Sequence, residues 1–388
     1  MSGAETGRPF GAVFARMLHD GVSDEPLPDM LVEIAEGRIT GLRSATADAA
    51  RRAGALMAEV AAPGFIDLQI NGANDVQFNF DPTVAALEKI AAGARRGGTA
   101  HLLPTYITAP GQDYRQAMAA VAEAIARRVP GILGLHLEGP FLSPARPGIH
   151  DPGAIRRMEA DDLAALTAPF PGKLLLTVAP EELPPGYLAA LEKAGVIVFA
   201  GHSAATSAQI VAAEAQGLRG ATHLFNAMSQ MTGREPGVVG AVLGSDRLFA
   251  GIIADGHHVD ATNLRIAARL MPDRLCLVTD AMLTLAGTRD RFMLNGAEIL
   301  LRNGRLANAE GRLAGAHVAM DDCVRQMRAA AGITQDLALR MATTNPARAL
   351  GCTDRLGTLR PGTRASLALL DADLHAKAVV VDGTVLLQ

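Results

Sequence analysis

The chain has 388 residues, of which 49% are hydrophobic and 4% aromatic, with no Trp. This length and aliphatic content are enough for one large α/β barrel with a smaller additional module. The formal net charge is −4, with acidic and basic residues mixed along the chain, which excludes a broad basic surface for nucleic acid or for an anionic membrane.

The cysteines and the N-terminal segment indicate an intracellular protein. Cys276, Cys323 and Cys352 are odd in number and widely spaced, so no disulfide framework is expected. Residues 1–10 lack the apolar core of a secretion signal, and no apolar run has the length of a membrane span. We therefore expect a cytoplasmic enzyme or binding protein with no membrane partner.

Both ends of the chain have strand patterns. Short apolar runs over 11–16, 30–35 and 39–42 are mirrored by runs over 365–370, 378–381 and 384–387, and the turn Asp382-Gly383 predicts a hairpin. Neither end is long enough for a core of its own. We therefore predict one small β-sandwich module built from residues 1–62 and 352–388.

Between the ends, strand and helix signals alternate. Helix-like stretches are expected over 84–96, 116–128, 188–194, 207–215 and 263–270. Strand-like runs end near Gln69, Thr105, Glu138, Glu181, His202, His223, Asp255 and Asp280. This alternation predicts parallel βαβ units and a (β/α)8 TIM-like barrel over residues 63–351. A short β excursion over 291–307 interrupts it, followed by helices over 318–330 and 339–350, the second made irregular by Pro346.

Three of these strand ends supply metal-ligand side chains. Glu138, His202 and His223 follow successive apolar runs, and in such barrels the active site lies at the C-terminal strand ends. A single His there is usually structural, but an unpaired carboxylate within an apolar strand is costly to bury. One carboxylate and two imidazoles suit one divalent ion, for which we expect Zn²⁺, and leave a position where water can be activated.

Asp280 ends the apolar run that should be the last barrel strand. Its structural alternative is an N-cap or an ion-paired carboxylate. As a functional group it would act as general base toward the water and then as general acid toward the departing amine. With the three ligands, it predicts metal-dependent hydrolysis of an amide.

The sequence leaves more than one role possible for other polar residues beside these strand ends. His136 shares a strand face with Glu138 and is preferred as an interior structural histidine over a further ligand. His150 lies in the following loop and can polarise a carbonyl or bind a sugar hydroxyl. Arg234 and His258 lie in glycine-bracketed loops after strands. An arginine in a loop usually contacts only solvent. Beside an active site, however, its planar guanidinium can make two parallel hydrogen bonds to a phosphate or a carboxylate.

Taken together, these segments resemble the N-acetylglucosamine-6-phosphate deacetylases, a family of the amidohydrolase superfamily. The matching segments occur in family order, at residues 63–72, 136–140, 200–203, 222–228, 233–237, 254–259, 278–280 and 357–362. The resemblance covers nearly the whole chain, and it implies the same barrel and composite β module.

The resemblance also implies roles for individual residues. Metal ligation falls to Glu138, His202 and His223, and acid–base catalysis to Asp280. The substrate-binding residues that it implies are His150 near the acetamide, Asn226, the Ala227 backbone, Arg234 and His258 at the sugar phosphate, and Leu313 at the acetyl pocket. It further implies a homodimer in which Arg234 can reach the neighbouring subunit's site. The implied reaction is hydrolysis of N-acetyl-D-glucosamine 6-phosphate to D-glucosamine 6-phosphate and acetate, in amino-sugar catabolism.

One departure from the wider superfamily concerns the number of metals. Many members carry His-x-His at the first strand end, where this chain has Gln69 and Asn71. Because a neutral amide is a poorer ligand than imidazole, we expect one tightly held metal per subunit, with Gln69 touching its water.

Three alternatives to the implied reaction stay open. The first is the same deacetylation of N-acetylgalactosamine 6-phosphate, since no residue decides the C4 configuration. A non-catalytic scaffold is disfavoured by the intact set of ligands and Asp280. A cyclic-amide hydrolase or deaminase is disfavoured by the missing His-x-His and by the Arg234 loop.

Overall fold

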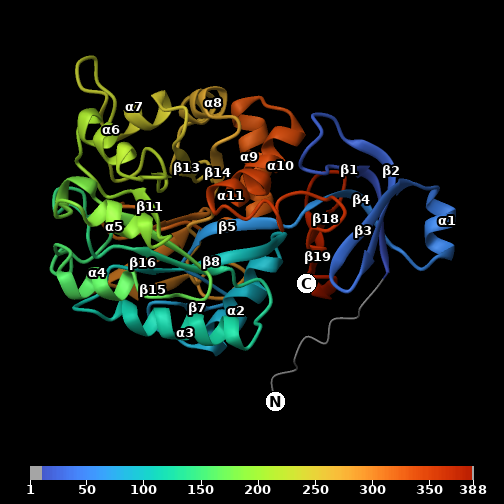
Figure 1. Ribbon diagram of the computed structural model, residues 1–388, viewed down its shortest axis with the longest axis horizontal. Coiled ribbons are helices and arrows are strands. Elements are labelled where there is room, and N and C mark those ends of the chain that lie inside the picture. The colour runs from blue at the N-terminus through green and yellow to red at the C-terminus, as the bar shows by residue number, and fades with distance from the viewer. Residues whose placement is uncertain (1–10, 387–388) are drawn as a thin grey trace.

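The computed structural model describes residues 11–386, and its main body is an eight-stranded parallel barrel (Figure 1). The barrel strands are β5 (Phe65–Ile70), β8 (Thr99–Ile107), β9 (Gly134–Glu138), β10 (Lys173–Val178), β11 (Ile197–Ala200), β12 (Gly220–Ala221), β13 (Phe249–Ile252) and β14 (Leu275–Leu277). All nine residues of β8 are buried, as expected for a strand that has barrel core on one face and helices on the other. The predicted fold class is confirmed.

The first and last strands are joined by backbone hydrogen bonds just beyond β14. Asp280 N donates to the Gln69 carbonyl at 2.8 Å, and Asn71 N donates to the Ala281 carbonyl at the same distance. On the neighbouring strands, Glu138 of β9 is in register with Ile107 of β8 and with Thr177 of β10. Closure of the barrel therefore brings the C-terminal ends of β5, β9 and β14 to one mouth.

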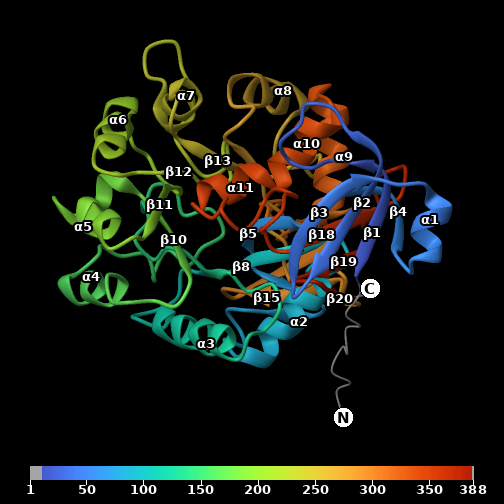
Figure 2. The same cartoon turned by 45° about the vertical axis from the view of Figure 1, so that its right-hand side comes forward.

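Helices surround the strands, as Figure 2 shows for those from α2 to α8. Their bounds are α1 (Ala47–Arg52), α2 (Val84–Arg95), α3 (Tyr114–Ala126), α4 (Ala160–Leu166), α5 (Tyr187–Lys193), α6 (Ser207–Ala215), α7 (Gly237–Gly244), α8 (Ala261–Leu270), α9 (Met320–Ala331), α10 (Gln335–Ala342) and α11 (Thr344–Ala349). Side-chain caps begin several of them: Thr83 accepts from Ala86 N, and Asp260 accepts from Thr262 N. Within residues 11–386, no helix combines the length and the apolar character that crossing a bilayer requires.

The two chain ends meet in a single seven-stranded sheet beside the barrel, where the blue and red strands of Figure 1 lie together. In spatial order its strands are β20 (Thr384–Leu386), β19 (Ala376–Val381), β18 (Leu367–Leu370), β4 (Leu56–Pro63), β1 (Ala12–Leu18), β2 (Leu27–Ala35) and β3 (Arg38–Ser44). Val13, Val32, Ala61, Leu367 and Val380 belong to one apolar core that draws on both ends of the chain. The composite β module is thus present. Its predicted residue boundaries stay predictions, and residues 1–10, 387 and 388 lie outside the described part.

Details of the secondary structure differ from expectation. The helix predicted over 339–350 is two helices, α10 and α11, which meet at Thr343, and Pro346 lies in the first turn of the second, where a missing N–H is tolerated. The run expected to end near Glu181 ends at Val178, and Glu181 lies in a 3₁₀ turn, η1 (Pro180–Glu182).

The β excursion after Asp280 is confirmed as a three-stranded antiparallel sheet. Its strands are β15 (Arg291–Leu294), β16 (Ala297–Arg302) and β17 (Arg305–Ala307). A separate small hairpin, with the two-residue strands β6 (Gly72–Ala73) and β7 (Val76–Gln77), follows the end of β5. Phe292, Ile299 and Leu306 of this sheet share a buried cluster with Met282 and Leu283, which follow Asp280. The excursion is therefore anchored at the C-terminal mouth of the barrel.

A buried carboxylate lies at the junction of β5 and β14. Asp67 accepts hydrogen bonds from the backbone N of Gln69 at 3.1 Å and of Thr279 at 3.3 Å, and its other oxygen lies 2.5 Å from Thr279 Oγ1. Complete burial raises the pKa of Asp67 to about 7. Thr279 Oγ1 donates to this oxygen, but burial outweighs the bond, so the folded chain binds a proton that the unfolded chain releases near pH 4.

We expect Asp67→Asn to flatten the dependence of unfolding free energy on pH. The pKa of Asp67 is higher in the folded chain than in the unfolded one. The stability that protonated Asp67 contributes to the wild type is therefore fully present below about pH 4 and is lost as pH rises through about 7. Above pH 7 the variant should exceed the wild type by on the order of a few kcal/mol, since Asn carries no charge to bury. Denaturant midpoints between pH 5 and 8 measure this. Asp48→Asn, on exposed α1, should leave the slope unchanged; equal slopes for Asp67→Asn and wild type would refute the assignment.

Candidate metal-dependent active site

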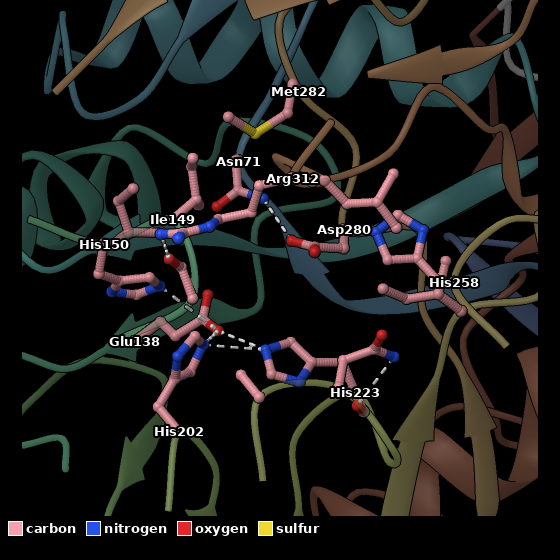
Figure 3. Close-up of a pocket in the computed structure, with 17 residues that line it drawn as sticks. Asn71, Glu138, Ile149, His150, His202, His223, His258, Asp280, Met282 and Arg312 are labelled. Atoms are coloured by element: carbon pink, nitrogen blue, oxygen red, sulfur yellow. Dashed lines mark hydrogen bonds and ion pairs between the residues drawn. The ribbon is translucent and has the colours of Figure 1, made fainter. Parts of the chain in front are cut away.

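A cavity of about 240 Å³ opens at the C-terminal ends of the barrel strands (Figure 3). The predicted site residues that line it are Glu138, His150, His202, His223, Asn226, Ala227, His258, Asp280 and Leu313. Glu138 is the last residue of β9, whereas His202 and His223 each come two residues after the end of their strand. The barrel therefore brings together residues that are up to 175 positions apart in the chain, from Glu138 to Leu313.

Glu138, His202 and His223 point toward one another (Figure 3). Glu138 Oε1 lies 3.0 Å from His202 Nε2 and 2.8 Å from His223 Nε2, and the two Nε2 atoms are 3.1 Å apart. One ligand atom from each residue falls within 4.8 Å of the others, and all three side chains are buried. Two imidazoles and one carboxylate that converge on one point can hold a divalent cation.

The hydrogen bond behind His202 supports this arrangement. Its Nδ1 lies 3.0 Å from the Arg146 carbonyl, which can only accept, so the proton belongs on Nδ1 and Nε2 keeps a lone pair for a metal. The Nδ1 of His223 is buried and has no partner among the described residues. The donor set therefore fits a divalent ion, with one of its two imidazoles oriented by a backbone carbonyl.

Glu138 remains ionised in this setting. Burial by itself would raise the pKa of Glu138, but the hydrogen bonds with His202 and His223 and the charge of His223 outweigh burial and hold the pKa below its usual range. An ionised carboxylate at the apex of the cluster provides the negative charge that a cation needs.

Asp280 lies across the cavity from the three-residue cluster. Its Oδ1 accepts from Gln69 Nε2 at 3.1 Å and from Asn71 Nδ2 at 2.6 Å. Burial, together with the charge of Glu138, raises the pKa of Asp280 to about 6. A carboxylate that exchanges protons near neutral pH suits general base and acid chemistry.

Gln69 links the two halves of the site. Its Nε2 also lies 3.1 Å from Glu138 Oε2, so one amide bridges the Glu138 and Asp280 carboxylates. The predicted contact between Gln69 and a metal-bound water stays a prediction.

Three of the four central residues have left-handed backbones. The φ angles of His202, His223 and Asp280 are 48°, 31° and 48°, and Ala227 has 49°. Residues other than Gly rarely adopt this backbone conformation, and when they do it is often at functional sites. The turn at each strand end aims its side chain into the cavity instead of along the barrel wall.

His150 and His136 have different surroundings. His150 Nδ1 lies 2.8 Å from Thr108 Oγ1, and its ring centroid lies 4.3 Å from that of His202. Burial lowers the pKa of His150 to about 3, so its imidazole is neutral at the cavity. His136 bonds Thr105 and Thr177 inside the barrel, and burial lowers its pKa to about 4, which agrees with the structural interpretation.

The loop residues expected at a phosphate group are only partly brought together. His258 faces the cavity, and its Nδ1 lies 2.7 Å from Asp255 Oδ2, which fixes its ring orientation. Asn226 and Ala227 line the cavity near His223. Arg234 does not line it: residues 231–236 are exposed, in a loop held by bonds between Thr232 and Glu235.

Two of the cavity residues outside the predicted set have polar side chains, Asn71 and Arg312. Asn71 directs its amide at Asp280, and its position two residues after Gln69 on the same face was the available signal. Arg312 lines the cavity and donates from Nη1 to the Gly148 carbonyl at 3.1 Å. Only its position beside Leu313 could have indicated it.

Relatives with known names share this architecture. The N-acetylglucosamine-6-phosphate deacetylase of Haemophilus influenzae is 38% identical over 323 residues, which cover 82% of this chain and 84% of that protein. The N-acetylgalactosamine-6-phosphate deacetylase of Escherichia coli O157:H7 is 36% identical over 363 residues, covering 92% and 94%. The crystal structure of N-acetylglucosamine-6-phosphate deacetylase from Pasteurella multocida superposes with a TM-score of 0.90 at 31% identity, over 97% of this chain and 100% of that one.

The family model that matches this chain spans the barrel and most of the C-terminal part of the β module. It is the model of the amidohydrolase family, and it covers residues 60–386. With the relatives above and the metal-ligand cluster at the barrel mouth, it establishes that the chain belongs to the amidohydrolase family.

Proposed function

We propose that this protein hydrolyses N-acetyl-D-glucosamine 6-phosphate to D-glucosamine 6-phosphate and acetate, as a cytoplasmic step of amino-sugar catabolism. The observation that carries the proposal is the convergence of Glu138, His202 and His223 opposite Asp280. The deacetylase names of the relatives supply the substrate class.

The metal site would consist of Glu138, His202 and His223, with one Zn²⁺ per subunit. A divalent ion bound there supplies Lewis-acid activation of water and of the acetamide carbonyl. Gln69 and Asn71 occupy the end of the first strand, and their amide N–H groups already donate to the Glu138 and Asp280 carboxylates. Because these amides satisfy the carboxylates, a second tightly bound ion is not expected.

Asp280 is the proton carrier of the proposed reaction. Its carboxylate takes a proton from the attacking water and transfers it to the departing nitrogen of the sugar, which leaves as a neutral amine. The bonds from Gln69 and Asn71 hold Oδ1, so Oδ2 is the oxygen left to move the proton. His150, neutral and held by Thr108, is positioned to contact the acetamide or a sugar hydroxyl.

We assign the 6-phosphate of the substrate to the part of the cavity lined by His258, Asn226 and Ala227. His258, Asn226 and the Ala227 backbone would contact it from the same subunit, and Leu313 would face the acetyl methyl. Arg234 projects from an exposed loop outside its own cavity, so we propose that it acts across the interface of a homodimer.

A second candidate substrate is N-acetylgalactosamine 6-phosphate. Relatives named for either epimer match this chain at 36–38% identity over most of its length. The same catalytic groups would act on both, because the two sugars differ only at C4.

An acetate-release assay with both N-acetylhexosamines, each with and without the 6-phosphate, tests the proposal. We expect the 6-phosphorylated glucosamine derivative to have the highest kcat/KM and the unphosphorylated sugars to be slower by at least about 100-fold, as for loss of a well-placed charged contact. No acetate release from either phosphorylated sugar would refute the function, and a preference for the galactosamine derivative would favour the second candidate.

Subunit mixing tests the role of Arg234. Arg234→Gln and Asp280→Asn homodimers should both be poorly active. In a mixed dimer, the Arg234→Gln subunit retains Asp280 and would receive Arg234 from its partner. Activity should therefore reappear on mixing if Arg234 acts across the interface, and stay absent if it acts within its own subunit.

A further inference from the structure

A second cavity, of about 420 Å³, lies at the other end of the barrel. It is bordered by Ile132 and Leu133, which precede β9, by Lys173, the first residue of β10, and by the segment 352–364 that links α11 to β18. These are N-terminal strand ends, so the cavity faces away from the catalytic mouth. We refer to it as the basic cavity.

The basic cavity carries charge of one sign. Lys173, Arg355 and Arg364 line it, and no acidic residue is among the described residues that do so. By contrast, a neighbouring surface hollow of about 330 Å³ balances Arg219 and Arg247 with two glutamates. Three cationic side chains therefore line one hollow, although the chain as a whole carries a net charge of −4.

The cations keep hydrogen-bonding capacity. Lys173 Nζ lies 3.4 Å from the Gly351 carbonyl, a long contact to a neutral group. Arg355 Nε lies 3.4 Å from Asp354, and Arg364 Nη1 lies 3.3 Å from Asp382, so each guanidinium uses one of its five N–H donors on a half-exposed pair. The remaining donors can serve a ligand.

A backbone hydrogen bond brings the main chains of the two arginines together. Arg364 N donates to the Arg355 carbonyl at 2.9 Å, which closes the segment 355–364 into a loop. Two guanidinium groups from adjacent backbone positions and the Lys173 ammonium line the same cavity, and such groups suit the several oxygens of a phosphate.

The other wall of the cavity is apolar. Ile125, Ile132 and Leu356 contribute to it. A bare inorganic ion would leave this wall unused, whereas a small phosphorylated organic molecule would cover it, and the volume lies in the range of small-ligand sites.

We propose that the basic cavity binds a small phosphate monoester, with its phosphate held by Lys173, Arg355 and Arg364 and its carbon skeleton against Ile132 and Leu356. This site is separate from the catalytic cavity and goes beyond the proposed function.

Calorimetric titration of the metal-loaded enzyme with glucosamine 6-phosphate tests the proposal, with glucosamine and inorganic phosphate as comparison ligands. The variant Arg355→Gln/Arg364→Gln should lose one binding event per chain, with affinity there reduced at least 10-fold, and it should keep acetate release unchanged. The matched control is Arg360→Gln, which removes an exposed arginine that donates to the Thr353 carbonyl outside the cavity lining.

A charge-preserving variant separates binding from folding. Arg355→Lys/Arg364→Lys keeps both charges but loses the planar forks, so it should lose less affinity at the second site than the Gln double variant. Equal stoichiometry in wild type and in the Gln double variant would overturn the proposal, as would equal loss in the Lys and Gln variants. Inorganic phosphate that binds as tightly as glucosamine 6-phosphate would overturn the assignment of an organic monoester. Because acetate release is measured separately, failure here leaves the proposed function testable.

Discussion

Replacing Asp280 with Asn is expected to lower the rate of acetate release by about 10²- to 10⁴-fold, the usual contribution of a positioned acid–base group. The carboxamide can still accept the hydrogen bonds that Gln69 and Asn71 donate to Oδ1, so the geometry should persist. It cannot take a proton from water or return one to the sugar nitrogen. The loss should therefore appear in kcat, with KM little changed.

Metal content and rate must be measured on the same samples. Asp280→Asn should retain one equivalent of metal, since Asp280 is not one of the three clustered ligand residues. Asp260→Asn is the matched control, because that carboxylate caps α8 at the surface and has no contact with the cavity. A metal-replete Asp280→Asn enzyme with wild-type turnover would remove Asp280 from the proposed mechanism.

The residues of the central cluster could be predicted because of barrel topology. Parallel strands that close on themselves bring all their C-terminal ends to one mouth, so polar residues at separate strand ends must meet there. Glu138, His202, His223 and Asp280 each follow a short apolar run, and this alone brought them together in the prediction. The left-handed backbones of His202, His223 and Asp280 could not be anticipated, since none of these residues is Gly.

Contacts made by the β excursion could not be predicted in the same way. Arg312 donates to the Gly148 carbonyl, and Asn295 Nδ2 donates to the Ile149 carbonyl at 3.0 Å, so the excursion is bonded to the loop that carries His150. These pairings join residues about 150 positions apart, and no periodicity of the sequence encodes them. A loop arginine that lines a cavity has the same local pattern as a solvated one.

In the β module, too, local features could be predicted from the sequence but long-range pairings could not. The hairpin of β19 and β20 was evident from Asp382-Gly383 because a turn is a local signal. The parallel pairing of β1 with β4, and the antiparallel pairing of β4 with β18, join distant segments. Apolar alternation identified the other strands but not β4, and the order of the strands in the sheet depends on packing against the barrel.

Replacing Glu138 with Gln is expected to remove the metal and, with it, activity. Glu138 Oε1 is the atom closest to both Nε2 atoms of the cluster, and its pKa is held low by those two imidazoles, so it supplies the negative charge of the site. A neutral amide is a much weaker ligand for a divalent cation. Because loss of a residue that merely supports a ligand weakens metal affinity by about 10- to 100-fold, loss of the ligand itself should weaken it by more than about 100-fold.

Dialysis against a weak chelator, followed by metal analysis and the acetate assay, distinguishes lost affinity from lost folding. Wild type and Glu192→Gln, which alters an exposed glutamate, should retain one equivalent of metal. Glu138→Gln should emerge metal-free yet folded, because Gln can still bond His202 and His223. Excess zinc should then restore part of its activity, since the two imidazoles remain. Full retention of metal after dialysis would show that the ion is held elsewhere, and the three-residue cluster would lose its assigned role.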